Sequence, residues 1–143
     1  MTQKQRLRTG FSGETKLLPY LIAVNLTRRC NLKCAHCYLD AGGKDESITE
    51  ELSTSELCNL FSEIAEKAEG TLIVLTGGEP LLRPDIGELV STGNSLGLRM
   101  VLGTNGLGLS AKIAQELKVS GLQGVGISLD NLYSEAHDQF RGV

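Results

Sequence analysis

Apolar residues along this chain gather in short runs, separated by longer stretches in which apolar positions recur with the spacing of a helix. The short runs are long enough for strands but too short for helices of usual length. Because strands buried in a parallel sheet appear as nearly uninterrupted apolar runs, we predict parallel strands here. The predicted strands are residues 21–26, 72–76, 99–102 and 125–129.

The stretches between these runs carry helix signals. Ser53 and Glu56 form a capping-box pattern, and apolar residues then recur at helical spacing until Gly70. Cys58 lies midway along this segment and is expected to be a small packing residue. The predicted helices are residues 53–70, 84–97 and 110–121, with the start of another near Ser134.

Strands and helices alternate in this prediction, and the later strands begin roughly 26 residues apart, close to the ~30 residues of a right-handed βαβ unit. We therefore predict an α/β fold with a parallel sheet. Ligands of such sheets gather beyond the carboxyl ends of the strands. Every unusual motif lies at the carboxyl end of a predicted strand: closely spaced cysteines, then GGEP, GTNG and SLD.

Size and composition limit what the chain can bind. Its 143 residues suffice for one domain or part of one, and 41% hydrophobic with 22% charged residues is ordinary globular composition. A net charge of -3 gives no electrostatic reason to expect nucleic acid or an anionic membrane as partner. Aromatic residues make up 4% with no Trp, which argues against base-stacking platforms. A small partner is favoured.

The polar residues 1–18 are interpreted as a flexible leader, and residues 19–143 as the ordered domain. No apolar run reaches the ~18 residues of a membrane span, and no signal-peptide cleavage site follows the leader. We expect a cytoplasmic protein, whose thiols stay reduced and act as metal ligands or catalytic groups.

The segment RRCNLKCAHCY places Cys30, Cys34 and Cys37 on one loop. Thiolates bind soft metals, and these three could hold three corners of an iron–sulfur cube and leave one iron open for another ligand. A zinc site that adds the neighbouring His36 is the alternative. His137 and Asp138 are a weak second metal-binding pattern.

The other motifs offer polar groups at the same rim. GGEP supplies glycines for close backbone approach and a carboxylate, Glu79, that could accept hydrogen bonds from an ammonium group; a simple turn is the alternative. GTNG could be only a tight turn. Ser128 and Asp130 suit a ribose or a carboxylate, although Asp130 could instead cap the next helix.

Taken together, RRCNLKCAHCY, TGGEPLLRPD, GTNG and GISLDN resemble the radical S-adenosylmethionine (SAM) superfamily, over about residues 20–143. The resemblance implies that the cysteines hold a [4Fe-4S] cluster whose fourth iron chelates the amino and carboxylate groups of SAM. The implied cluster ligands are Cys30, Cys34 and Cys37.

The same resemblance implies a set of SAM-binding residues. Those near the methionine ammonium would be Gly77, Gly78 and Glu79. Those near the ribose and the methionine carboxylate would be Thr104, Asn105, Ser128 and Asp130. Tyr38 and His36 flank the last cysteine and would shield the cluster or meet the adenine, and Arg141 is a candidate partner for the SAM carboxylate.

The implied reaction is reductive cleavage of SAM to a 5′-deoxyadenosyl radical that abstracts hydrogen from a substrate. The segments CNLKCAHCYLDAG and LTGGEPLLRPD look most like the branch containing pyrroloquinoline-quinone and modified-haem biosynthesis enzymes and peptide-modifying enzymes. The implied substrate is a small molecule, such as a tetrapyrrole, or a peptide. The implied reductant is a protein such as flavodoxin or ferredoxin.

The family fold is a partial parallel (β/α)6 barrel similar to a TIM barrel, and the sequence supplies about its first four strands. We therefore interpret residues 19–143 as the N-terminal part of a longer radical SAM core domain. Two other hypotheses are a zinc-stabilised binding module and a catalytically inert cluster-binding fragment.

Overall fold

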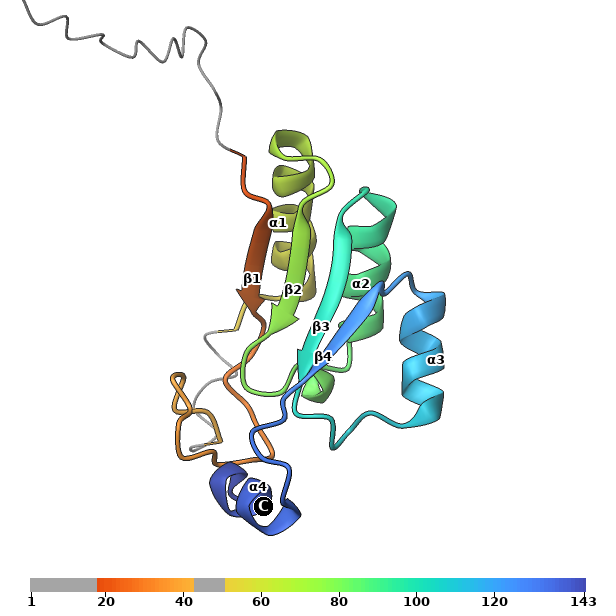
Figure 1. The fold of residues 1–143 in the computed structure, drawn as a ribbon. Coiled ribbons are helices and arrows are strands. Elements are labelled where there is room, and N and C mark those ends of the chain that lie inside the picture. The colour runs from red at the N-terminus through yellow and green to blue at the C-terminus, as the bar shows by residue number, and fades with distance from the viewer. Residues whose placement is uncertain (1–17, 43–50) are drawn as a thin grey trace, which may run out of the picture.

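A parallel sheet forms the centre of this computed structural model, which describes residues 18–42 and 51–143 (Figure 1). Its four strands are parallel, as predicted, and they lie side by side in chain order. They are β1 (Leu21–Asn25), β2 (Leu72–Thr76), β3 (Arg99–Thr104) and β4 (Gly124–Ile127). The last strand is shorter than the predicted residues 125–129. Ser128 N–H still donates to Thr104 O at 3.0 Å, but the chain then leaves the sheet.

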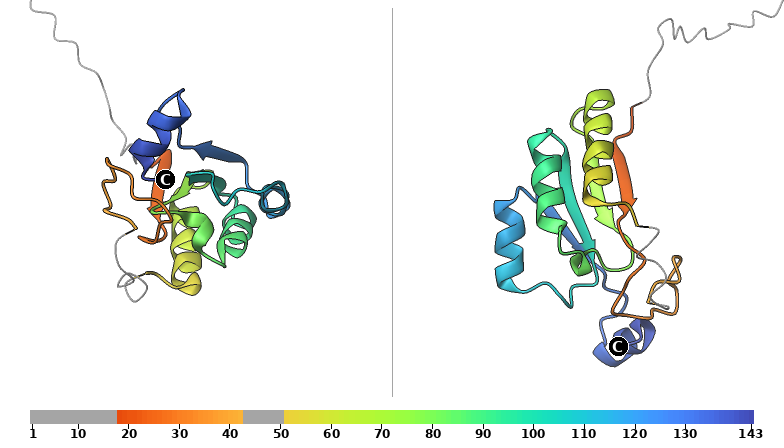
Figure 2. Two further views of the ribbon diagram at one scale, coloured as in Figure 1. Left: turned by 90° about the horizontal axis from the view of Figure 1, so that it is seen from below. Right: turned by 180° about the vertical axis from the view of Figure 1, so that it is seen from behind.

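Helices connect the strands in right-handed βαβ order and cover one face of the sheet (Figures 1 and 2). The helices on this face are α1 (Thr54–Lys67), α2 (Ile86–Ser95) and α3 (Ala111–Val119). A further helix, α4 (Ser134–Arg141), lies beyond the carboxyl ends of the strands. The α/β prediction is confirmed.

Local signals set the helix starts. The predicted capping box is present at α1, where Glu56 N–H donates to Ser53 Oγ at 3.3 Å and Ser53 N–H donates to Glu56 Oε2 at 2.8 Å. Ser110 caps α3 by accepting from Ile113 N–H at 3.2 Å. One short element was not predicted: a 3-10 turn, η2 (Pro80–Leu82), directly after GGE.

The core lies between the sheet and helices α1 and α2. Along β2 and β3 the side chains alternate, so that Ile73, Leu75, Met100 and Leu102 are buried against the helices while their neighbours are half-buried on the other face. Cys58 packs against this core, as predicted. The sequence motifs lie at the carboxyl ends of these strands, where the half-buried face of the sheet ends.

The cysteine-bearing segment and α4 lie side by side beyond the carboxyl ends of the strands (Figures 1 and 2). A backbone hydrogen bond from Ala35 N–H to Phe140 O at 3.0 Å joins them. In the described ranges, no helix is long and apolar enough to cross a membrane. The predicted leader lies outside the described residues except for Leu18.

Candidate cofactor site

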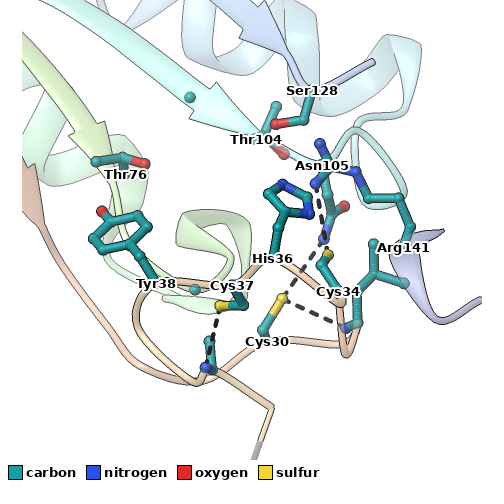
Figure 3. Close-up of a pocket in the computed structure, with 15 residues that line it drawn as sticks. Cys30, Cys34, His36, Cys37, Tyr38, Thr76, Thr104, Asn105, Ser128 and Arg141 are labelled. Atoms are coloured by element: carbon teal, nitrogen blue, oxygen red, sulfur yellow. Dashed lines mark hydrogen bonds between the residues drawn. The ribbon is translucent and has the colours of Figure 1, made fainter. Parts of the chain in front are cut away.

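A pocket of about 210 Å³ lies at the carboxyl ends of the strands. Figure 3 shows the cysteine segment on one side of it and the polar side chains of Thr104, Asn105 and Ser128 on the other. All of the predicted site residues except Glu79 and Asp130 line this pocket. The fold therefore brings together motifs that are far apart in the sequence, while their roles toward a cofactor stay predictions.

Each of the three clustered thiols accepts a hydrogen bond from an N–H group, and none is in a disulfide. The donor–acceptor pairs are Leu32 N–H to Cys30 Sγ (3.4 Å), Ala41 N–H to Cys37 Sγ (3.3 Å) and Arg141 Nη1 to Cys34 Sγ (3.7 Å). Hydrogen bonds to sulfur stabilise thiolate ligands and tune the potential of an iron–sulfur cluster. The thiols thus lie in surroundings suited to metal-bound thiolates.

The thiols do not converge on a single ion. Among the described residues, no group of three or more His, Cys, Asp or Glu side chains could hold one metal ion. His36 instead stacks on Phe140, with ring centroids 4.5 Å apart, and its Nε2 lies 4.0 Å from Asp130 Oδ1. This geometry does not assemble the alternative zinc site. A donor set of three separated sulfurs at one pocket fits a multi-iron cluster better.

Burial raises the pKa of the Cys30 thiol, and the neighbouring Cys34 and Glu79 raise it further, against the lowering effect of the Leu32 and Asn105 N–H groups. Metal ligands must be deprotonated. Binding of a metal at Cys30 is therefore coupled to release of a proton.

The two glycines of GGEP allow the cysteine segment to pack directly on the turn after β2. A Cβ on Gly78 would lie 2.2 Å from Arg29 O, and Gly77 has a φ of +130° with its ideal Cβ position 2.5 Å from Thr27 O. Two backbone hydrogen bonds replace side-chain contacts here: Gly78 N–H donates to Thr27 O at 2.7 Å, and Glu79 N–H donates to Arg29 O at 2.8 Å. The close approach predicted from the sequence is made to the chain itself, next to Cys30.

Glu79 lies behind the pocket wall with 1% of its surface exposed. Its carboxylate accepts from Thr104 Oγ1 at 2.8 Å, Asn105 N–H at 2.8 Å and Leu81 N–H at 3.0 Å. These contacts join the turn after β2 to the end of β3. The role of Glu79 toward an ammonium group stays a prediction.

Gly103 and Thr104 of GTNG end β3, which is two residues longer than predicted, and only Asn105 and Gly106 lead into a turn. Asn105 Oδ1 accepts from Leu107 N–H at 2.9 Å. Its amide also donates to Asn31 Oδ1 at 2.8 Å and lies 3.9 Å from Cys30 Sγ. The same residue therefore shapes the turn and the pocket.

Arg141 and Asp130 form an ion pair of 2.5 Å beside Cys34. Asp130 is not the cap of α4, because Tyr133 occupies that position without a side-chain hydrogen bond, so the alternative reading of Asp130 is wrong. His137 Nδ1 accepts from Asp130 N–H at 3.3 Å, and His137 and Asp138 belong to no metal-binding group in the described chain. The contact of α4 with the cysteines was not predicted, since it joins residues 107 positions apart.

Tyr38 is exposed over 77% of its surface, and its hydroxyl donates to Asn25 Oδ1 at 3.0 Å. This bond places the ring beside the end of β1, on the edge of the pocket (Figure 3). The position is compatible with the predicted shielding role and does not test it.

The fold and the site define a parallel α/β domain with three thiols, a glycine turn and polar strand ends around one pocket. The chain belongs to the radical SAM superfamily, whose model matches residues 24–143. Enzymes of this superfamily use a [4Fe-4S] cluster and SAM.

Curated relatives carry names from haem synthesis and peptide maturation. The chain is 41% identical over 126 residues to an AdoMet-dependent heme synthase of Methanosarcina barkeri, covering 87% of this chain and 35% of the relative. It is 42% identical over 123 residues to the Fe-coproporphyrin III synthase of the same organism, covering 86% and 30%. Mycofactocin maturase MftC of Mycobacterium tuberculosis is 33% identical over 125 residues, covering 87% and 31%. The chain spans about a third of the length of these relatives.

Solved structures share the fold. Streptococcus suis SuiB bound to S-adenosylmethionine matches with a TM-score of 0.71 at 20% identity, covering 85% of this chain and 28% of SuiB. BtrN in complex with AdoMet and 2-DOIA matches with a TM-score of 0.64 at 23% identity, covering 88% and 53%. The parallel sheet described here corresponds to part of these barrel-like folds.

Proposed function

We propose that this chain is the portion of a radical SAM enzyme that holds a [4Fe-4S] cluster on Cys30, Cys34 and Cys37 and binds SAM in the adjoining pocket. The observation that carries the proposal is the arrangement of these free thiols, which line one pocket with the ends of β2 and β3. When bound, the reduced cluster supplies the electron that cleaves SAM to methionine and a 5′-deoxyadenosyl radical.

The described residues fit this cofactor pair in their chemistry. Three soft sulfur donors, each accepting an N–H hydrogen bond, suit three irons of a cube and leave the fourth without a protein ligand. Hydroxyl and amide groups of Thr104, Asn105 and Ser128 border the same space and can bind the polar parts of a nucleoside or an amino acid. Their shared origin at rigid strand ends favours a fixed orientation of the bound molecule.

Arg141 has fewer N–H groups left to bind a ligand than a free arginine, because its guanidinium is already hydrogen-bonded within the protein. The Arg141 residue is 9% exposed, and its guanidinium donates hydrogen bonds to the Asp130 carboxylate and to the sulfur of Cys34. We infer that it stabilises negative charge on the Cys34 thiolate, and that any contact with the SAM carboxylate uses its remaining N–H groups.

We further propose a tetrapyrrole as the substrate of the whole enzyme. Identities of 41% and 42% to relatives named as haem and Fe-coproporphyrin III synthases exceed the 33% to the peptide maturase, which favours the tetrapyrrole over a peptide. A one-electron donor protein such as flavodoxin or ferredoxin would reduce the cluster.

Anaerobic reconstitution of the chain with iron and sulfide tests the cofactor proposal. We expect about four irons and four sulfides per chain, as a [4Fe-4S] cluster requires, and a change of its electron paramagnetic resonance spectrum when SAM is added. Cys34→Ser should abolish incorporation, whereas Cys58→Ser, which removes a thiol packed on the core, should not. Stoichiometric zinc without sulfide would instead support the zinc-stabilised module. A cluster that yields no 5′-deoxyadenosine on reduction with SAM would support the inert fragment.

A further inference from the structure

A buried arginine outside the pocket is bound to the beginning of the cysteine segment. Arg83, in the turn between η2 and α2, is 6% exposed. Its Nε and Nη2 donate to the two carboxylate oxygens of Asp85 at 2.9 and 2.6 Å. This hydrogen bonding raises the pKa of Arg83 and lowers that of Asp85. The forked pair fixes the plane of the guanidinium.

The remaining nitrogen of Arg83 is directed at two backbone carbonyls. Nη1 donates to Leu26 O at 3.1 Å and to Leu52 O at 3.0 Å. Leu26 is the first residue after β1, and its N–H donates to Thr76 O at the end of β2. The chain therefore leaves the sheet toward the cysteines with Leu26 held on both its N–H and its carbonyl.

A second arginine and a shared carboxylate extend this contact to the cysteine segment. Glu51 Oε2 lies 3.7 Å from Arg83 Nη1, and Glu51 Oε1 lies 3.3 Å from Arg29 Nε. Arg29 directly precedes Cys30, and its carbonyl accepts from Glu79 N–H at 2.8 Å. The segment 26–29 is thus fixed by backbone bonds to the glycine turn and by this ion-pair network.

We propose that Arg83 is a positioning residue that fixes the start of the cysteine segment and thereby the place of Cys30 beside the glycine turn. Arg83 does not line the pocket, so it acts through the backbone and not by touching a ligand. The expectation that Arg83 affects cluster binding rests on the proposed function. The expectation that Arg83 fixes the position of the Cys30 thiol does not.

Two physical arguments separate this role from general stability. Relative to apolar residues of similar volume, a buried ion pair contributes little net stability, because the desolvation of both charges offsets their attraction. Four of the five guanidinium N–H groups are used in one fixed fork, which a lysine ammonium cannot reproduce. The hydrogen bonds of Arg83 therefore affect the position of the cysteine segment more than the free energy of unfolding.

The test compares Arg83→Lys with a matched control, Arg99→Lys. Arg99 also donates from its side chain to a backbone carbonyl, Gly70 O at 2.8 Å, but it begins β3 at the opposite end of the sheet. Rates of alkylation of each cysteine would be measured by mass spectrometry in metal-free, reduced protein. Iron and sulfide content would be measured after reconstitution at limiting iron.

We expect Arg83→Lys to change the alkylation rate of Cys30 several-fold and to lower iron incorporation several-fold, with the rate at Cys58 unchanged. Arg99→Lys should alter neither, even if it lowers the melting temperature. Asp85→Asn should change the alkylation rate of Cys30 in the same direction by a smaller factor. If Arg83→Lys does not fold, Asp85→Asn is used for the test in its place. Wild-type rates at Cys30 and wild-type iron content in both network variants would overturn the proposal. If wild-type chain takes up no cluster, the proposed function fails while the alkylation rates still decide this inference.

Discussion

The hydroxyl of Thr104 donates a 2.8 Å hydrogen bond to the carboxylate of Glu79 and so joins the end of β3 to the turn after β2. The N–H groups of Asn105 and Leu81 complete the set of donors to this buried carboxylate. Because a buried polar group without partners is costly, the contact constrains both strand ends at the rim of the pocket.

Thr104→Val should destabilise the fold, since it keeps the shape of the side chain but removes the hydroxyl that donates to Glu79 and accepts from Gly106 N–H at 3.0 Å. The expected loss in free energy of unfolding is about 1–3 kcal/mol, the usual cost of a buried group left short of a partner. Urea denaturation measures it. Thr92→Val is the control, because within residues 18–42 and 51–143 the hydroxyl of Thr92 makes only one contact, accepted from the Cys58 thiol at 3.7 Å. Equal stability of the two variants would show that the hydrogen bonds of the Thr104 hydroxyl to Glu79 and Gly106 add nothing to the free energy of unfolding.

Gly78→Ala should separate the glycine turn from the cysteine segment. The added methyl carbon would lie 2.2 Å from Arg29 O, so the two backbones have to move apart. We expect loss of stability by more than about 2 kcal/mol, as overpacking typically costs 1–3 kcal/mol, together with reduced iron incorporation. Gly87→Ala lies within α2, with its nearest contact at 3.8 Å, and should gain up to about 1 kcal/mol from helix propensity. Thermal unfolding of both variants distinguishes local crowding from a general effect of the methyl group.

Features determined by neighbours in the sequence could be predicted from it. The capping pair Ser53 and Glu56 lies within one turn of helix, and the apolar strands carry their own period, so these elements follow from local physical chemistry. The end of β4 was misplaced by two residues because Ser128 and Leu129 remain compatible with a strand. The strand ends at Ile127 because the chain turns away from the sheet toward α4.

Contacts between distant segments were predictable only as far as topology dictates. Parallel strands bring their carboxyl ends to one rim, which is why the cysteines were expected to meet the glycine turn. Which atoms meet was not predictable. The approach of Gly78 to Arg29 O and the bond from Arg141 to Cys34 depend on tertiary packing that no local pattern encodes.

The ion pair of Arg83 and Asp85 should make the free energy of unfolding depend on pH. Hydrogen bonding to Arg83 holds the folded pKa of Asp85 below its ordinary value of 3.8, so the native state binds the proton less readily than the unfolded chain. The stabilisation is complete above that ordinary value and is lost as pH falls through the lower folded pKa. The difference in free energy of unfolding between wild type and Asp85→Asn should therefore shrink from neutral pH to below 3.8. Denaturant titrations across this range measure it, and a constant difference would contradict the assignment.

Phe140→Leu should loosen the cysteine segment without unfolding the sheet. The Phe140 ring stacks on His36 at 4.5 Å with 7° between the planes, and the Phe140 carbonyl accepts from Ala35 N–H at 3.0 Å. Loss of the stack leaves that backbone bond less protected, so we expect faster hydrogen exchange at the Ala35 amide and unchanged exchange in β2 and β3. Leu132→Ala alters a side chain that is 93% exposed in the loop before α4 and should leave the Ala35 amide as in wild type. If Ala35 exchanges at the wild-type rate in Phe140→Leu, the aromatic contact does not hold the segment, and the backbone bond and the ion pair of Arg141 with Asp130 suffice to keep α4 on the cysteines.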